Sequence, residues 1–203
     1  MKFDRSPPED AAIAQGLASL KRQGGTVLVV GAATTAHADA CERFLGDTDH
    51  EHVFVRTDRM VRPEEESSEA AAVIERPVLT RSAKSDTTRT SALDTEMLSA
   101  DIESAMRAAA DDAESVRVCF DSLRPLIDGV DRPALVSFLD TVRDIARDTG
   151  SVVHFHLPAM ADAVPSGLFD TVDAVVELNG QGHATYQQWH LPESGQTSEW
   201  VEI

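Results

Sequence analysis

The segment at residues 26–38 constrains the fold more than any other part of the chain. It reads Thr-Val-Leu-Val-Val-Gly-Ala-Ala-Thr-Thr-Ala-His-Ala. The residues before Gly31 form an unbroken β-branched and apolar run, which is typical of a strand covered on both faces. The residues after it predict a helix. In many α/β proteins a junction of this kind binds a phosphate at the helix N-terminus.

The other predicted elements alternate in a way that favours a mostly parallel sheet. We expect a helix before Gly24, and further helices over residues 35–45, 95–110 and 131–150. Strands are expected over residues 52–56, 115–122, 151–156 and 172–178. Asn179-Gly180-Gln181-Gly182 predicts a tight hairpin turn, with antiparallel strands at 184–191 and 198–203.

The chain is predicted to be one domain over residues 1–203 with a polar insertion at about 57–95. A length of 203 residues suits a single α/β domain, and 42% hydrophobic residues suffice for a core. The insertion is polar and aperiodic, with a short strand possible only at Pro77–Thr80. We expect it to be a flexible, solvated linker, with a partner-binding loop as the alternative.

Acidic residues dominate the charge of the chain. There are 35 acidic and 18 basic residues, which gives a formal net charge of −17, and lysine occurs only at positions 2, 21 and 84. One interpretation is attraction of a basic partner. The other is adaptation of the whole surface to a salty cytoplasm, where the screening length falls to ~3 Å at 1 M salt. The even spread of the acidic residues favours the second, and the scarcity of basic clusters argues against nucleic-acid binding.

The ends and the cysteines add further expectations. The polar N-terminus does not resemble a signal peptide, and no apolar run approaches 18 residues, so we expect a cytoplasmic protein that does not insert into a membrane. Cys41 and Cys119 form no CxxC pair. Their spacing therefore predicts neither a disulfide framework nor a metal site.

The junction at residues 31–38 is a poor match to a phosphate-binding loop. The motif G-x-x-x-x-G-K-[ST] needs two glycines, a lysine for the terminal phosphate and a hydroxyl for Mg²⁺. Gly31 matches the first glycine, but Ala36, His37 and Ala38 replace the other three. Thr34 and Thr35 are expected to cap the helix. The loop is therefore expected to be a tight structural turn, with weak anion binding through Gly31, Thr34, Thr35 and His37 as the alternative.

Asp121 ends an apolar strand. This is the pattern that holds Mg²⁺ through water in nucleoside triphosphatases. The alternative, which the missing lysine and hydroxyl favour, is that Asp121 caps the turn at Ser122-Leu123.

Histidines offer a third candidate site. His154 and His156 share one face of a strand because they are two residues apart. His156, His37 and Asp121 are expected near the carboxyl ends of the parallel strands, where open α/β sheets bind ligands. A His37/Asp121/His156 cluster is therefore a hypothetical metal or anion site. The alternative is that the strand histidines are satisfied by hydrogen bonds and that His37 is exposed.

Two tryptophans are expected on the terminal strands. Trp189 and Trp200 stand out because aromatic residues make up only 5% of the chain. They are expected to cover the core at the sheet edge, and a contact surface is the alternative.

Several motifs occur in the order seen in KaiC/RecA-like ATPase domains. They are strand-Gly31, Phe120-Asp121-Ser122-Leu123, the helix at 132–147, and the strands at 152–156 and 172–178. Val118–Leu126, His154–Pro158 and Trp189–Leu191 also look like a haloarchaeal family of small KaiC-related domains of unknown function. The resemblance implies a three-layer RecA-like fold with antiparallel strands at its C-terminal edge. The departure at residues 36–38 argues against ATPase activity and against ATP and Mg²⁺ as cofactors. Asp58, the nearest carboxylate after the second strand, receives no catalytic role.

The expected function is therefore a non-catalytic KaiC/RecA-like domain that regulates or assembles with protein partners, and homo-oligomers are possible. The alternative is a nucleotide- or anion-binding sensor, or a weak ATPase, that uses the altered loop at residues 31–38. A metal site at His37, Asp121 and His156 is the third hypothesis.

Overall fold

Nine strands form one mixed sheet in the computed structural model, which describes residues 8–46, 50–58, 70–76, 94–113, 115–181 and 184–203. The strand order is β3-β2-β4-β5-β1-β6-β7-β8, and β9 also pairs with β7. The strands are β1 (Gly25–Val30), β2 (Glu51–Arg56), β3 (Ala72–Glu75), β4 (Val116–Phe120), β5 (Val152–Leu157), β6 (Ala174–Gln181), β7 (Ala184–Leu191), β8 (Gln196–Thr197) and β9 (Val201–Glu202). The helices are α1 (Pro8–Gln23), α2 (Thr34–Leu45), α3 (Thr95–Asp112), α4 (Arg124–Gly129) and α5 (Arg132–Asp148), with short 3-10 turns at Ala161–Ala163 and Phe169–Thr171.

The strands predicted at residues 26–30, 115–122 and 151–156 are confirmed as three neighbouring strands inside the sheet. Every residue of β1, β4 and β5 is buried. β1 pairs in parallel with β5 on one side and with β6 on the other. β6, β7, β8 and β9 supply the antiparallel edge. The predicted α/β class and the mostly parallel sheet are therefore confirmed.

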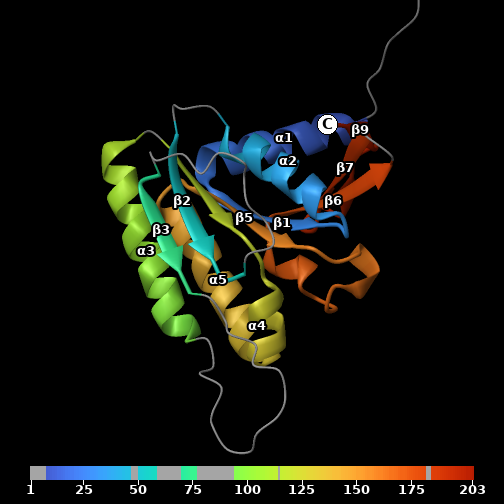
Figure 1. Ribbon diagram of the computed structural model, residues 1–203. Coiled ribbons are helices and arrows are strands. Elements are labelled where there is room, and N and C mark those ends of the chain that lie inside the picture. The colour runs from blue at the N-terminus through green and yellow to red at the C-terminus, as the bar shows by residue number, and fades with distance from the viewer. Residues whose placement is uncertain (1–7, 47–49, 59–69, 77–93, 114, 182–183) are drawn as a thin grey trace, which may run out of the picture.

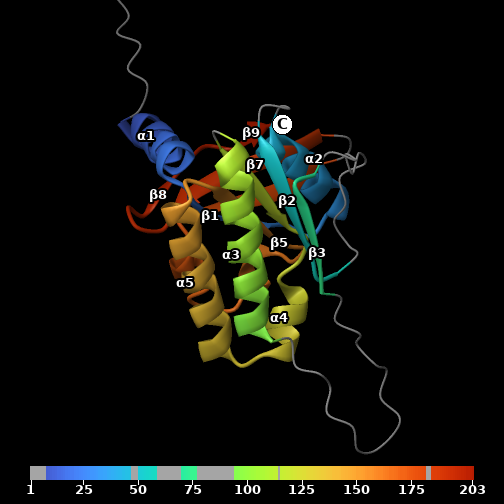
Figure 2. The ribbon, with the colours of Figure 1, turned by 90° about the vertical axis from the view of Figure 1, so that its left-hand side faces the viewer.

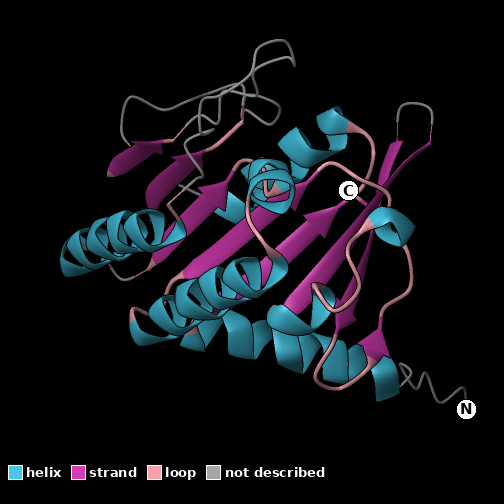
Figure 3. Cartoon of the chain, turned by 90° about the horizontal axis from the view of Figure 1, so that it is seen from below, coloured by secondary structure: helices cyan, strands magenta, loops and turns pink. Residues whose placement is uncertain are grey.

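Helices cover both faces of the sheet (Figure 1). On one face, α3, α4 and α5 pack on alternate residues of the strands, such as Leu28, Phe120 and Phe155. Figure 2 shows α3 and α5 side by side on this face, and Figure 3 shows from below that helices lie on both sides of the strands. The opposite face carries α1 and α2 over the other set of alternate residues, such as Val27 and Val29. None of the described helices is long and apolar enough to cross a membrane.

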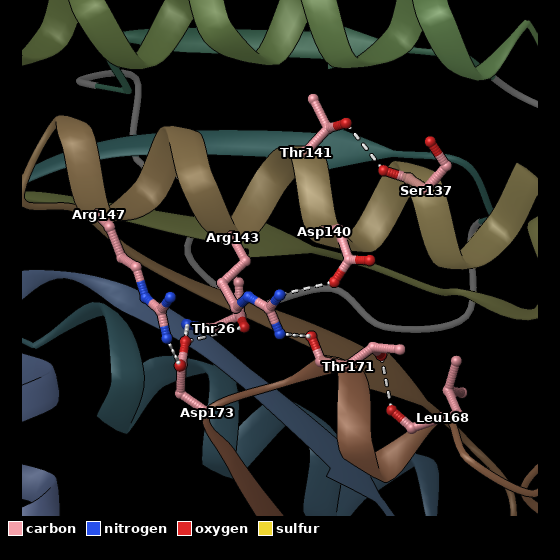
Figure 4. A network of polar contacts seen from close by, with 9 residues as sticks. All are labelled: Thr26, Ser137, Asp140, Thr141, Arg143, Arg147, Leu168, Thr171 and Asp173. Carbon is pink, nitrogen blue, oxygen red and sulfur yellow. Dashed lines mark hydrogen bonds and ion pairs between the residues drawn. The ribbon is translucent and has the colours of Figure 1, made fainter. Parts of the chain in front are cut away.

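Polar contacts fix α5 to the sheet at the amino ends of β1 and β6 (Figure 4). Asp173 accepts a hydrogen bond of 2.8 Å from the backbone N–H of Thr26 and also pairs with Arg147. Arg143 donates to the carbonyl of Thr171 at 3.2 Å. The predicted start of α5 is confirmed, because Asp131 accepts a hydrogen bond from the N–H of Ala134.

Some local predictions differ from the structure. β3 lies at residues 72–75 of the predicted insertion, where backbone pairing with β2 orders a short alternating segment. The possible strand at 77–80, like most of the insertion, lies outside the described residues. α4 was not predicted; proline in its first turn is compatible with a helix start. Asn179–Gln181 belong to β6 rather than to a turn. The antiparallel strand expected at 198–203 is confirmed only as the short β9, and β8 just before it was not predicted.

Gly31, which follows β1, packs closely against β6. Its φ is 151°, and a Cβ there would lie 2.7 Å from the carbonyl oxygen of Leu178. We expect Gly31→Ala to lower the free energy of unfolding by about 3 kcal/mol. The added Cβ would force the backbone at Leu178 to move, and residue 31 would also keep a φ angle that is strained for alanine. Urea unfolding measures this loss.

The matched control is Gly195→Ala. Gly195 also has a positive φ of 68°, but nothing lies within 4 Å of its added Cβ. Only the conformational strain of about 1–2 kcal/mol is then expected. Equal losses in the two variants would contradict the close packing of Gly31 on β6.

Candidate functional site

His37 turns into the protein from the first turn of α2. The helix begins at Thr34, only three residues after Gly31, so position 37 lies on its buried side. The imidazole is fully buried. Its Nε2 lies 2.8 Å from the carbonyl oxygen of Gly31, and its Nδ1 lies 2.9 Å from Nδ1 of His156. The side chain at the lysine position of the motif therefore closes the loop from inside, and the expectation that His37 is exposed is wrong.

The hydrogen bonds of His37 determine which nitrogens carry protons. A carbonyl oxygen only accepts, so Nε2 of His37 donates to Gly31. Burial lowers the pKa of His37 to about 4, with a further contribution from His156, so the ring is neutral. Its Nδ1 is then an acceptor, and Nδ1 of His156 donates to it. Burial also lowers the pKa of His156. Neutral His156 therefore carries a lone pair on Nε2.

Thr34 and Thr35 do not cap α2. Ala33 is the N-cap residue, and no side chain hydrogen-bonds to the start of the helix. Both threonines are exposed. The predicted capping role is therefore wrong, because the turn after Gly31 is too short for a threonine to reach the cap position. The amide of Gly31 itself donates to the carbonyl of Ala159 at 2.9 Å. The residues of this loop do not match what a Mg²⁺-bound nucleotide requires.

Asp121 connects the ends of β4 and β2. Its carboxylate accepts hydrogen bonds from the N–H and the hydroxyl of Thr57, at 2.8 and 2.9 Å, and from the N–H of Asp58 at 3.0 Å. Burial raises its pKa to about 6, although the hydrogen bonds from Thr57 act in the opposite direction. The turn that follows is capped by Ser122, whose Oγ accepts from the N–H of Arg124. Asp121 therefore joins two strands instead of capping the turn at Ser122-Leu123.

A cluster of two cysteines and two histidines lies beneath α2. Its members are Cys41, Cys119, His154 and His156, all buried, and one potential ligand atom from each lies within 4.8 Å of those of the others. Cys41 Sγ is 2.9 Å from Cys119 Sγ and 3.3 Å from His154 Nε2. This Cys₂His₂ cluster, as we call it, contains only one member of the predicted His37/Asp121/His156 trio. His37 contacts the cluster through His156, and Asp121 makes its hydrogen bonds elsewhere.

Each member of the Cys₂His₂ cluster has a defined position in the fold. Cys41 lies one turn after His37 on the inner side of α2. Cys119 and His154 are direct neighbours across the β4–β5 pair. His156 follows His154 on the same face, and their ring centroids are 5.2 Å apart. Three separate segments of chain therefore meet at this cluster.

Aromatic side chains pack against the buried Cys₂His₂ cluster. The ring of Phe44 stacks on His154 with 5.1 Å between centroids, and Trp189 packs against the edge of Phe44. Two imidazole nitrogens, His154 Nδ1 and His156 Nε2, are buried with no hydrogen-bond partner in the described structure. Such atoms are uncommon in folded proteins and call for a physical explanation.

The two cysteines differ in acidity. The pKa of Cys41 is well below its usual value, chiefly because the thiol of Cys119 donates to its sulfur, with a further contribution from His154. Burial raises the pKa of Cys119 well above its usual value. Cys41 is thus the sulfur on which a negative charge is stabilised, and a thiolate is the form that binds metals.

The sequence contained part of the signal for this cluster. The spacing of His154 and His156 correctly predicted that both side chains share a face. The missing information was the neighbour relation between β4 and β5, which brings Cys119 beside His154, and the position of α2 above them. Spacing rules for metal sites detect ligands that are close in sequence, whereas 78 residues separate the two cysteines here.

The tryptophans have different environments. Trp189 is half-buried and packs against the core beneath α2, as expected. Trp200, in contrast, is 40% exposed.

Comparison with known proteins gives a family but no activity. The model of a family of unknown function, DUF7504, matches residues 24–178, which is more than half of the chain. This range includes the loop at 31–37, Asp121 and all four members of the Cys₂His₂ cluster. No curated protein matches the chain.

We expect Asp121→Ala to lower the free energy of unfolding by about 1–3 kcal/mol, because it leaves the buried N–H of Thr57 without its acceptor, while the hydroxyl of Thr57 keeps the carbonyl of Ser122 at 2.6 Å. Asp121→Asn keeps one carbonyl oxygen and should cost less. Thermal or urea unfolding measures both. Asp162→Ala, at an exposed acidic residue, is the control and should change stability by no more than about 0.5 kcal/mol. An unchanged stability in Asp121→Ala would contradict a role in joining β4 to β2.

Proposed function

Because the chain belongs to a family of unknown function, DUF7504, we propose its role from its geometry: a non-catalytic KaiC/RecA-like domain that regulates or assembles with protein partners in a high-salt cytoplasm. The mostly parallel sheet with helices on both faces and an antiparallel C-terminal edge supports the RecA-like part of the proposal. The motifs that carry the resemblance lie in β1, β4, α5, β5 and β6, around the centre of this sheet.

The buried position of His37 is the main observation that supports a non-catalytic role. In a phosphate-binding loop a lysine at this place extends toward the terminal phosphate. Here the side chain is buried, donates to the carbonyl of Gly31 and contacts His156. A neutral ring held by two hydrogen bonds inside the protein gives no positive charge to a phosphate. Asp121 likewise directs its carboxylate at backbone and hydroxyl donors from the end of β2.

Calorimetric titration of the full chain with ATP and Mg²⁺ at about 2 M KCl tests this proposal. We expect no saturable heat and no release of phosphate, because the loop lacks the charge and the donors that hold a triphosphate. Saturable Mg²⁺-dependent binding that Asp121→Asn abolishes, with Asp162→Asn as the control, would overturn the proposal. It would support the alternative, a nucleotide-binding sensor or weak ATPase that uses the loop at 31–38.

The antiparallel edge offers a place for a protein partner. Trp200 and Val201 are 40% and 54% exposed, and β9 pairs with β7 within the described strands. Aromatic side chains at accessible edges are frequent anchors of protein contacts. A photoreactive amino acid at position 200 is expected to cross-link one specific protein, or a second copy of the chain, in high-salt extract. The same group at exposed Met97 on α3 is the control. Identical products from both positions would contradict a partner site at this edge.

The charge of the chain makes a separate prediction about salt. With a net charge of −17, self-repulsion destabilises the folded state at low ionic strength. Raising KCl from about 0.1 M to about 1 M shortens the screening length from about 10 Å to about 3 Å. We expect the melting temperature to rise across this range, as measured by circular dichroism. A melting temperature that is constant or falls with KCl would contradict adaptation to a salty cytoplasm.

A further inference from the structure

We propose that the Cys₂His₂ cluster is a closed zinc site with a structural role. Its ligands would be Cys41 Sγ, Cys119 Sγ, His154 Nε2 and His156 Nε2. This inference goes beyond the proposed function, because it requires neither a nucleotide nor a protein partner.

The ligand atoms of the four side chains favour zinc over other metal ions. Two thiolates and two imidazoles are a common ligand set of structural zinc, which prefers four ligands in tetrahedral geometry. The magnesium and calcium ions that other α/β proteins bind prefer oxygen ligands. Since the protein fills all four positions, no place remains for water or a substrate, which indicates a structural rather than a catalytic ion.

His156 provides the most specific evidence. Its Nδ1 donates to His37, so the other nitrogen, Nε2, carries a lone pair. This atom is buried and has no hydrogen-bond partner within the described part of the chain. A buried acceptor nitrogen is unfavourable unless a hydrogen-bond donor or a metal ion binds its lone pair. A metal ion among the neighbouring sulfurs would be such an acceptor.

His37 acts as a positioning residue for this ligand. Metal-binding histidines usually donate their second N–H to a fixed acceptor, which sets the tautomer and the orientation of the ring. Here His37 is that acceptor, and it is in turn oriented by the carbonyl of Gly31. The altered loop is therefore connected to the ligand set by two hydrogen bonds.

Charge balance also favours zinc. A buried ion of charge +2 requires compensation, because an isolated charge is costly in an apolar environment. Two thiolates neutralise it, and two neutral imidazoles complete the shell without adding charge. The enclosure by Phe44 and by the strands is then compatible with the bound ion.

Only a small movement would be needed to admit zinc. The two sulfurs are 2.9 Å apart. With Zn–S bonds of about 2.3 Å in a tetrahedron, they would lie about 3.8 Å apart. Because Cys41 lies on α2 and Cys119 on β4, a shift of about 1 Å between helix and sheet provides this separation. The ion would then join α2 to β4 and β5.

The experiment measures metal in the full chain, purified anaerobically at molar KCl without chelators. We expect about one zinc per chain by elemental analysis. Cobalt substitution should give the visible bands of a tetrahedral ion together with thiolate-to-metal charge transfer. Cys119→Ser and His156→Gln should each lose most of the metal, at least about tenfold in affinity. His190→Gln, at a histidine on β7 outside the cluster, is the matched control and should retain it.

A readout on the unmodified chain keeps the proposal testable if the cysteine variant does not fold. Zinc should protect both thiols from an alkylating reagent, and a chelator should expose them and lower the melting temperature, with recovery when zinc is added back. A folded chain with both thiols free and no saturable uptake of zinc would overturn the proposal. So would a Cys41–Cys119 disulfide in the anaerobic protein, or full zinc content in His156→Gln.

The positioning role of His37 has its own test. His37→Leu should weaken zinc binding by about 10–100-fold, as measured by competition with a chelator. His37→Gln keeps an acceptor for His156 and should restore much of the affinity and the cobalt spectrum. Equal affinities in the leucine and glutamine variants would contradict the positioning role, because a purely steric effect does not depend on the acceptor.

Discussion

The arrangement of the buried histidines beneath α2 depends on the hydrogen bond from His37 to the carbonyl of Gly31. This hydrogen bond closes the turn between β1 and α2 and holds the imidazole inside the protein. Because the ring is neutral and its Nε2 is the donor, its other nitrogen must accept, and this fixes the tautomer of His156. One contact in a strand-to-helix turn thus decides which atom of a distant strand is left with a lone pair.

The hydrogen bond from His37 to Gly31 also bears on whether this end of the sheet suits a phosphate or a metal ion. A phosphate site requires donors and positive charge directed outward from the turn. Here the donors that the structure describes are directed inward: Gly31 donates to Ala159, and His37 donates to Gly31. Asp121 is likewise engaged by the end of β2. Two imidazole nitrogens without a hydrogen-bond partner in the described structure, His154 Nδ1 and His156 Nε2, lie in the interior between α2 and the sheet, close to the two cysteines.

Local sequence patterns predicted some helices and strands of this fold and missed others. Apolar runs of β-branched residues predicted β1, β4 and β5 because such runs are stable only when both faces are covered. The predicted start of α5 at residue 131 depends on local effects, namely the hydrogen bond that Asp131 accepts from Ala134 and the fixed φ angle of Pro133. Short elements such as β3 and α4 were missed, since their stability comes from pairing and packing with distant segments rather than from local pattern. Thr34 and Thr35 had the composition of a helix cap, but the length of the turn placed Ala33 at the cap position.

The sequence by itself determined the α/β class, the position of several strands, the acidic composition and the absence of a phosphate-loop lysine at position 37, because each depends on local composition or periodicity. It also placed His154 and His156 on one face of their strand. Only the tertiary structure decided that Cys119 lies beside His154, that α2 brings Cys41 to both, and that Asp121 accepts hydrogen bonds from the end of β2. These relations depend on strand order and on the seating of a helix, which arise from the burial of the whole apolar surface. No short stretch of sequence contains them.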